Sequence, residues 1–240
     1  MAEPTDVQHL VKHLMAGASP EENQALLEAL LSTLSQGPTD VTEDEAARIT
    51  ETYRIFLDVI GDSVALTGAG YLPPAVVEQF AERSGITRWW IGKANREDLT
   101  PPVAGVRDTA RALGLVSVRK GRLAPTAAGT RCRQDPQALW QHIVGRLPLG
   151  NKESDRQAGW MALAVVGSGV PAQERRREIS DLLFVLGWRS GADRYSHPPA
   201  HSPTLDVLDQ LAGAARTGWS RIEGGDFAVA ATARAVIGLG

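Results

Sequence analysis

Apolar residues along the first 60 positions recur every third or fourth residue, which is the spacing of one helix face. They predict three helices, over residues 7–15, 19–35 and 42–60. Thr42 and Glu45 form a capping box at the start of the third helix. A helical segment of this kind usually packs on the rest of the chain or on a second subunit. We therefore expect residues 1–62 to be a helical N-terminal segment that mediates a homodimer.

The middle of the chain changes between strand and helix signals. The predicted order is strand, helix, helix, strand and strand, over residues 64–67, 74–83, 101–113, 115–118 and 122–126. Gly114 ends the second helix, and Lys120-Gly121 forms a tight turn between the last two strands. A helix followed by a hairpin with a basic tip is typical of a winged helix-turn-helix, in which the hairpin is the wing. We therefore expect a winged-helix-like domain over residues 63–146.

The remainder of the chain predicts a helical C-terminal domain at residues 153–240, behind a linker at 147–153. Its helices are expected over residues 155–167, 171–187 and 204–215. A hairpin is expected to turn at Gly224-Gly225. The predicted fold class is mainly α with short β-hairpins (α+β).

A weak internal repeat offers a more specific organisation. Short stretches of similar composition follow each predicted strand or hairpin, at residues 66–70, 123–129 and 227–233. Two winged-helix-like units in tandem would produce this pattern, and so would chance in a chain rich in Ala and Gly. Both explanations stay open.

Composition agrees with an ordinary globular protein. The 240 residues are 43% hydrophobic and 22% charged, and Cys132 is the only cysteine, which excludes an internal disulfide and a cysteine-rich zinc site. No apolar run approaches the roughly 18–20 residues that span a bilayer. The acidic, polar start is neither a secretory signal nor a transit peptide. We expect a cytoplasmic protein without a membrane partner.

The net charge of −3 conceals a division along the chain. Residues 1–62 carry twelve Asp and Glu against three Lys and Arg, a net charge of −9. Residues 83–133 carry eleven Lys and Arg against three Asp and Glu, a net charge of +8. This basic block fits an electrostatic footprint for an anion or a nucleic acid. It fits equally well a surface that docks against the acidic N-terminal third of the same protein.

The candidate nucleic-acid-binding residues lie in the predicted helix 101–113 and in the wing. Arg107 and Arg111 are four residues apart and are expected to face outward together, toward phosphates or guanine edges of double-stranded DNA. Three cations at the tip of the wing would follow the DNA backbone: Arg119, Lys120 and Arg122. Alternatively, arginines on an exposed helix face are simply solvated, and Asp108 lies close enough to neutralise both helix arginines.

Three other pairs of residues have spacings that are compatible with a binding site. Trp89 and Trp90 fit a stacking platform, or more commonly anchors of the core. The pairs His9–His13 and His197–His201 have a spacing that can bind metal, but neither has an obvious third ligand. No catalytic constellation is recognisable in the sequence. We expect no enzyme activity, no metal and no cofactor.

The predicted wing also carries a family resemblance. Gly114-Leu115, Lys120 to Leu123 and Thr126-x-x-Gly129 resemble the wing of the multidrug-resistance-regulator class of winged-helix proteins, with Pro125 as a departure. The segments 66–74, 89–97, 114–123, 139–140 and 183–188 extend the resemblance. Through them a wider stretch, about residues 63–220, is similar to a family of uncharacterised actinobacterial proteins. The resemblance implies the fold and carries no activity with it. The expected function is a DNA-binding or regulatory protein; the alternative is a protein–protein interaction module in which the winged helices are structural.

Overall fold

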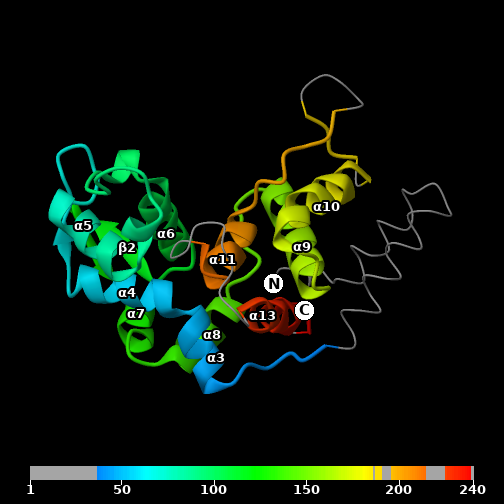
Figure 1. Ribbon diagram of the computed structural model, residues 1–240, viewed down its shortest axis with the longest axis horizontal. Helices are drawn as coiled ribbons and strands as arrows, with labels where there is room; N and C mark the ends of the chain where they lie inside the picture. The colour runs from blue at the N-terminus through cyan, green and yellow to red at the C-terminus, as the bar shows by residue number, and fades with distance from the viewer. Residues whose placement is uncertain (1–36, 186, 191–195, 215–224, 239–240) are drawn as a thin grey trace. The chain divides into compact units, whose positions relative to one another are not determined.

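The computed structural model describes residues 37–185, 187–190, 196–214 and 225–238 (Figure 1). The described part is mainly helical with one small antiparallel sheet of three strands, which confirms the predicted α+β class. The predicted helices at 7–15 and 19–35 lie outside the described residues, so the homodimer that they were expected to mediate stays a prediction.

The chain divides into two compact units, each assembled from separated stretches of sequence. Among the described residues, we call 42–146, 206–214 and 225–228 the winged-helix unit, and 37–41, 147–185, 187–190, 196–205 and 229–238 the C-terminal unit. The expected division at residue 62 therefore does not separate two units. The predicted linker at 147–153 does begin where the chain leaves the winged-helix unit.

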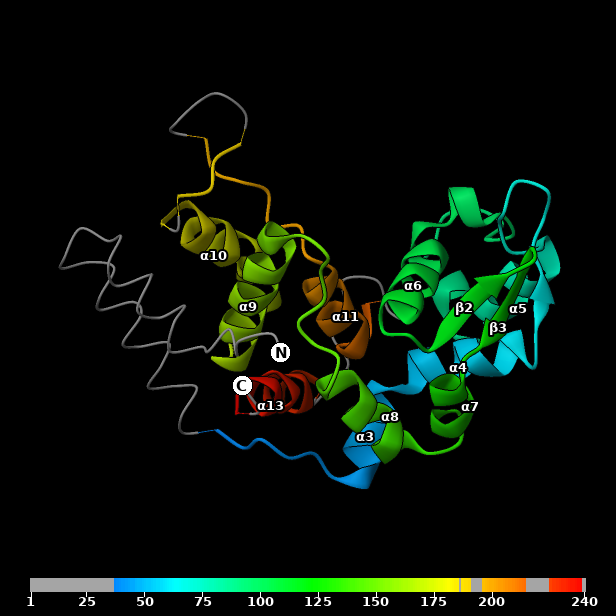
Figure 2. The same ribbon diagram turned by 180° about the vertical axis from the view of Figure 1, so that it is seen from behind.

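The winged-helix unit takes its name from the order and pairing of its elements. In chain order these are α3 (Glu43–Ile49), α4 (Glu51–Ile60), β1 (Val64–Ala65), α5 (Pro74–Arg83), η1 (Ile86–Arg88), η2 (Glu97–Leu99), α6 (Pro101–Ala112), β2 (Val116–Arg119), β3 (Arg122–Pro125), α7 (Ala127–Cys132) and α8 (Pro136–Val144). The strands lie in the order β1-β3-β2, all antiparallel, and β2 contacts α6. Figure 2 shows the β2–β3 hairpin beside α6. A winged helix has this topology: a helix, a strand, two helices and then a hairpin. The last strand of that hairpin pairs with the first strand.

The single helix expected over residues 42–60 is two helices in the structure, and that expectation is wrong. The predicted capping box is present, with Glu45 N donating to Thr42 Oγ1 and Thr42 N donating to the Glu45 carboxylate. At Thr50 the backbone leaves the helix, with φ −89° and ψ −2°, and the Thr50 hydroxyl donates to Ala46 O at 2.6 Å. A β-branched residue that bonds the preceding turn favours such a break.

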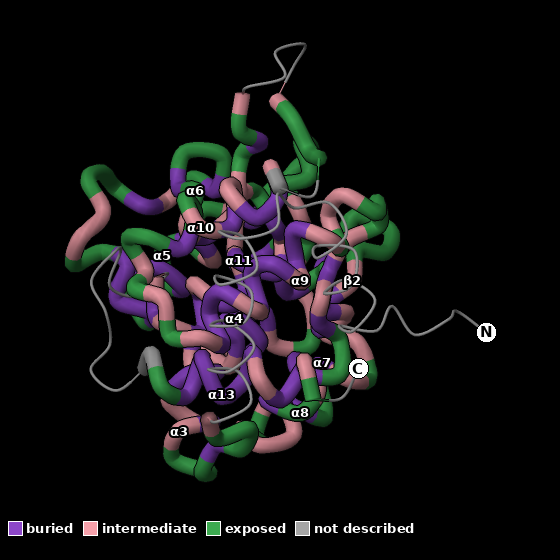
Figure 3. Tube along the Cα trace, turned by 90° about the vertical axis from the view of Figure 1, so that its right-hand side faces the viewer, coloured by how far each residue is buried: buried purple, intermediate pink, exposed green. Residues whose placement is uncertain are grey.

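Helix α4 is the centre of the winged-helix unit. None of its residues is exposed, and the tube view shows it buried or intermediate throughout (Figure 3). It contacts α5, α6 and β3. Its Phe56 ring meets the Phe80 ring of α5 edge to face at 5.3 Å between centroids. The hydrophobic core of this unit is therefore built around α4, the helix that precedes β1.

The wing is a tight hairpin, as predicted. Lys120 and Gly121 have φ values of +49° and +69°, so both central residues of the two-residue turn are left-handed, as a type I′ turn requires. The register places Arg119 opposite Arg122. Leu66 N donates to Gly121 O at 2.8 Å, which ties the turn to the chain beyond β1. The tip of the wing is therefore hydrogen-bonded to the segment that follows β1.

The Thr126-x-x-Gly129 stretch closes the wing onto the rest of the unit. The Thr126 hydroxyl donates to Gly114 O at 2.6 Å and accepts from Gly129 N at 3.1 Å, so it caps α7 and fixes the base of the hairpin together. A Cβ at residue 129 would collide with the carbonyl oxygen of Leu115. The glycine is therefore required by the close approach of α7 to the start of β2.

The C-terminal unit is helical where it is described. Its helices are α9 (Glu153–Gly167) and α10 (Ala172–Val185), and two further helices run across the unit boundary, α11 (Pro203–Leu211) and α13 (Gly225–Gly238). Residues 215–224 lie outside the described part. The residues after Gly224, expected to form the second strand of a hairpin, begin α13 instead. No strand occurs among the described residues of 153–240, so the structure gives no support to a second winged-helix unit.

Within the described ranges, no helix is both long enough and apolar enough to cross a membrane.

Replacing Gly129 with Ala tests the close approach of α7 to β2. We expect Gly129→Ala to lower the free energy of unfolding by about 2–3 kcal/mol, because the added methyl group meets backbone that cannot move aside cheaply. The matched change Gly68→Ala adds its methyl group in open space and should leave stability unchanged or raise it by up to about 1 kcal/mol. Urea denaturation followed by circular dichroism measures both, and equal effects would contradict the packing described here.

Candidate nucleic-acid interface

The five candidate DNA-binding residues do not share one environment. The four side chains that are exposed are Arg111 on α6 and Arg119, Lys120 and Arg122 at the tip of the wing. Arg107 on α6 is buried, with 8% of its surface exposed. The expectation that Arg107 and Arg111 face outward together is therefore wrong for Arg107.

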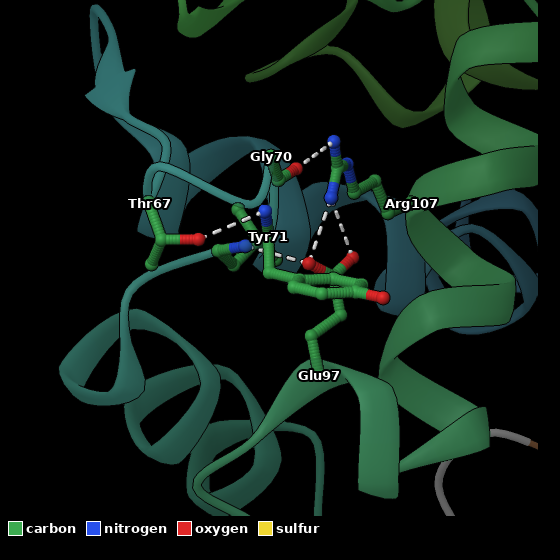
Figure 4. Close-up of polar contacts among 6 residues, drawn as sticks. Thr67, Gly70, Tyr71, Glu97 and Arg107 are labelled. Atoms are coloured by element: carbon green, nitrogen blue, oxygen red, sulfur yellow. Dashed lines mark hydrogen bonds and ion pairs between the residues drawn. The ribbon is translucent and has the colours of Figure 1, made fainter.

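Arg107 forms a buried ion pair with Glu97 of η2 (Figure 4). Its Nη1 atom donates to both carboxylate oxygens of Glu97, at 2.8 and 2.7 Å, and its Nη2 atom donates to Gly70 O at 2.9 Å. The Glu97 carboxylate also accepts from Leu72 N at 2.6 Å. These bonds join α6, η2 and the turn that follows β1. Arg107 is occupied inside the unit and offers no charge to a ligand.

The long connection between α5 and α6 explains why this arginine points inward. Helix-turn-helix motifs usually join their two helices by about three or four residues, whereas 17 residues lie between Arg83 and Pro101. The connection brings Glu97 beside α6, where Arg107 borders the buried stripe that contains Val106 and Ala110. Helical periodicity placed Arg107 on the polar side of α6. The prediction failed because periodicity carries no information on Glu97, the partner that holds Arg107 inside the fold.

The exposed face of α6 is nearly neutral once Arg107 is removed from it. Asp108 and Arg111 are its exposed charged side chains, and they cancel. Pro101 and Pro102 open the helix and have no amide hydrogens, so this N-terminus lacks two of the donors that bind phosphates at helix ends. Helix α6 is therefore poorly suited to binding DNA phosphates.

One flank of α6 is covered by the end of α11. Gln210 Oε1 accepts from the Tyr53 hydroxyl at 2.7 Å and from the Thr109 hydroxyl at 2.6 Å. Gly105 lies beside it, because a Cβ there would be 3.6 Å from Gln210 Nε2. Complete burial of the Tyr53 hydroxyl raises its pKa above the usual value, so it stays protonated and keeps donating. This network connects α4, α6 and α11 within the winged-helix unit.

The tip of the wing concentrates positive charge. Arg119, Lys120 and Arg122 occur within four residues, and Arg119 and Arg122 are directly opposite each other in the hairpin. The Arg122 guanidinium donates to the Ser63 hydroxyl at 2.7 and 3.1 Å, which orients it without neutralising it. None of the three forms an ion pair with any residue in the described part of the chain. Like charges opposite each other destabilise a hairpin, so an anion at this tip would relieve a cost of the free protein.

Other members of the basic block are paired with acids. Arg83 and Arg133 both bond Asp58 of α4, at 3.1 and 2.8 Å, and Arg96 bonds Asp98 at 2.6 Å. The bond from Arg133, with that from Arg83, holds the pKa of Asp58 below its usual value. Within the winged-helix unit, the basic block therefore meets one acid of the N-terminal third, Asp58.

The tryptophan pair is neither a core anchor nor an open platform. Trp89 and Trp90 are both half-buried, and their rings meet edge to face at 5.8 Å. They lie in the α5–α6 connection, which also exposes Ile91 and Leu99, at 95% and 60% of their surfaces. Sequence reasoning missed this apolar surface, because a segment without helix or strand periodicity gives no signal of which of its side chains are exposed.

No metal or thiol chemistry is built into the described residues. No group of three or more His, Cys, Asp and Glu among them could hold a metal ion. His9 and His13 lie outside the described part, and His197 Nδ1 lies 2.9 Å from the Asp181 carboxylate. Cys132 is buried, and burial raises the pKa of its thiol, which keeps it protonated and unreactive.

No protein-family model, curated protein or solved structure matches this chain. The winged-helix topology therefore depends on the element order and strand pairing described above. The resemblance to the multidrug-resistance-regulator class stays a prediction.

Breaking the buried ion pair tests the internal position of Arg107. We expect Arg107→Met to lower the free energy of unfolding by about 3–5 kcal/mol, because it leaves the Glu97 carboxylate buried without its partner. The double change Arg107→Met/Glu97→Gln should recover a substantial part of the loss, since the amide needs no counter-charge. Arg111→Met, the matched change on the exposed side of α6, should cost less than about 0.5 kcal/mol. Equal losses for the two single variants in chemical denaturation would contradict the burial of Arg107.

The ion pairs of Asp58 predict a pH dependence. Because the folded state lowers the pKa of Asp58, its stabilisation is complete above the usual carboxyl pKa of about 3.9 and is lost as pH falls through the lowered value. We expect Asp58→Asn to lower the free energy of unfolding by about 1 kcal/mol at pH 7. The difference from the wild type should shrink below pH 4. Asp62→Asn, an exposed carboxyl without an ion pair in the described residues, is the control and should show no such convergence.

Proposed function

We propose that this protein is a non-enzymatic winged-helix protein that binds nucleic acid through the phosphate backbone at its wing. The observation that carries the proposal is the tip of the wing, where three exposed cations lie on a fixed turn without a carboxylate partner in the described residues. Phosphate contacts of this kind position a protein on a duplex but do not read its sequence.

The proposal assigns different roles to the cations of α6 and of the wing. Arg107 positions α6 through Glu97, so it is structural. Arg119, Lys120 and Arg122 contact phosphates. Arg111 is the remaining exposed cation of α6 and lies one turn from Asp108, so its contribution is small. We therefore expect weak binding with little preference for sequence.

The salt dependence of the affinity reports how many phosphates the protein contacts. Each phosphate contact contributes about −0.9 to the slope of log affinity against log salt, so three wing cations predict a slope of about −2.7. Between 50 mM and 200 mM salt the affinity should then fall by roughly 40-fold.

Charge reversal at the wing tests this function. In fluorescence anisotropy with a labelled random-sequence duplex, we expect Arg119→Glu/Lys120→Glu to weaken binding at 50 mM salt by more than about tenfold and to bring the slope to about −1. Arg88→Glu/Lys93→Glu changes the net charge by the same amount at the α5–α6 connection and should bind as the wild type does. An equal loss in both double variants would contradict a wing-specific contact, and so would a slope near zero in the wild type.

A second candidate function is an interaction module in which the winged helix is structural. It is favoured by the pairing of Arg83 and Arg133 with Asp58, which removes part of the basic block from the surface. No duplex binding at any salt concentration, by a folded wild-type protein, would select this candidate over nucleic-acid binding.

A further inference from the structure

The tip of the α5–α6 connection has no role in the function proposed above. We call residues 88–93, Arg88-Trp-Trp-Ile-Gly-Lys93, the connection tip. Ile91 at its centre is 95% exposed, more than any other large hydrophobic residue in the described part of the chain. Isolated exposed apolar residues are common, but one beside two half-buried tryptophans is typical of an interaction surface.

The two tryptophans directly precede Ile91 in the sequence, and we call their rings the tryptophan base. Their rings meet edge to face at 5.8 Å. Trp90 lies back over Gly92, since a Cβ at residue 92 would be 3.8 Å from Trp90 Nε1. Trp89 Nε1 is buried without a hydrogen-bond partner among the described residues. Both rings are half-buried, so part of each ring surface is open to solvent beside the exposed Ile91.

The backbone after the tip is held in a strained conformation. Ala94 has a φ of +45°, which is unusual for a residue with a Cβ, and it is buried at 4% exposure. Gly92 has a φ of +125°. Strain of this kind persists only where the surroundings enforce it, and it concentrates at ligand-binding segments. The positive φ values of Gly92 and Ala94 shape the backbone on which Ile91 is exposed.

The charge around the tip has one sign. Arg88 and Lys93 are exposed at its two ends and form no ion pair with described residues. The carboxylates that follow in the connection are both occupied, Glu97 by Arg107 and Asp98 by Arg96. A partner at this surface therefore meets an apolar centre between two free cations.

From this combination we propose that the connection tip docks an acidic protein segment, one with apolar side chains placed between carboxylates. The apolar side chains would pack beside Ile91 on the tryptophan base, and the carboxylates would pair with Arg88 and Lys93. Such complementarity gives specificity and speeds association. This site is independent of the wing, and it does not depend on nucleic-acid binding.

A protein segment fits the connection tip better than a lipid surface does. Stable attachment to a bilayer needs substantial apolar insertion besides a few cations. Here only Ile91 projects fully, while the tryptophans stay half inside the fold. A protein partner can cover the exposed ring surfaces as well as Ile91.

The test is a selection of random 12-residue peptides displayed on phage, against the immobilised full chain. We expect the selected peptides to be enriched in Asp and Glu next to Leu, Ile or aromatic residues. Synthetic copies should lose at least tenfold in affinity with Ile91→Ser, and similarly with Lys93→Glu. Ile91→Ser exchanges a fully exposed side chain, so it should fold as the wild type does, which circular dichroism verifies.

Two controls make the result specific. Phe227→Ser removes another exposed hydrophobic residue, 77% exposed on α13, and Arg119→Glu/Lys120→Glu alters the wing; both should retain full peptide binding. Selection of no peptides, selection of peptides without acids, or binding that survives Ile91→Ser would each overturn the proposal. Sedimentation of the wild type, but not Ile91→Ser, with phosphatidylserine vesicles would also overturn it, in favour of a lipid surface.

Discussion

The position of α6 within the winged-helix unit depends on one buried ion pair, between Arg107 and Glu97. It joins three segments that are separated in the sequence: the turn after β1, the short helix η2 and the long helix α6. An ion pair inside a protein is costly unless its remaining hydrogen bonds are satisfied. Gly70 O and Leu72 N supply most of them, and Arg107 Nε is left without a partner among the described residues. The pair therefore fixes where α6 can lie rather than adding much net stability.

This constraint decides which cations remain available to a ligand. With Arg107 inside and Arg83, Arg96 and Arg133 paired with acids, the strongly basic block of the sequence becomes a few separate free cations. Three of them meet at the tip of the wing, and two flank the connection tip. Net charge along a sequence thus overstates the charge that the folded surface presents.

Local signals in the sequence predicted much of this fold, because each depends on neighbours within one turn. The capping box at Thr42, the helix starting at Pro101 and the turn at Lys120-Gly121 all occur where they were expected. The features that were missed depend on distant partners. Glu97 lies ten residues before Arg107, and Gln210 lies 101 residues after Thr109, so no periodicity in the sequence reports either contact.

The candidate site was predicted only in part, because its local features can be inferred from the sequence and its contacts with distant residues cannot. The wing cations are exposed because a two-residue turn leaves its tip in solvent whatever surrounds it. The side on which a helical arginine lies is decided by what packs against the helix, and here a 17-residue connection supplies the carboxylate.

The division between a structural α6 and a ligand-binding wing is tested most directly by titrating the ¹⁵N-labelled protein with a short DNA duplex and following its backbone amide resonances. The amides of residues 118–122 should shift progressively, and the shifts should weaken as salt is raised, while those of residues 103–112 stay in place. Shifts along the exposed side of α6, or none at the wing at low salt, would contradict it.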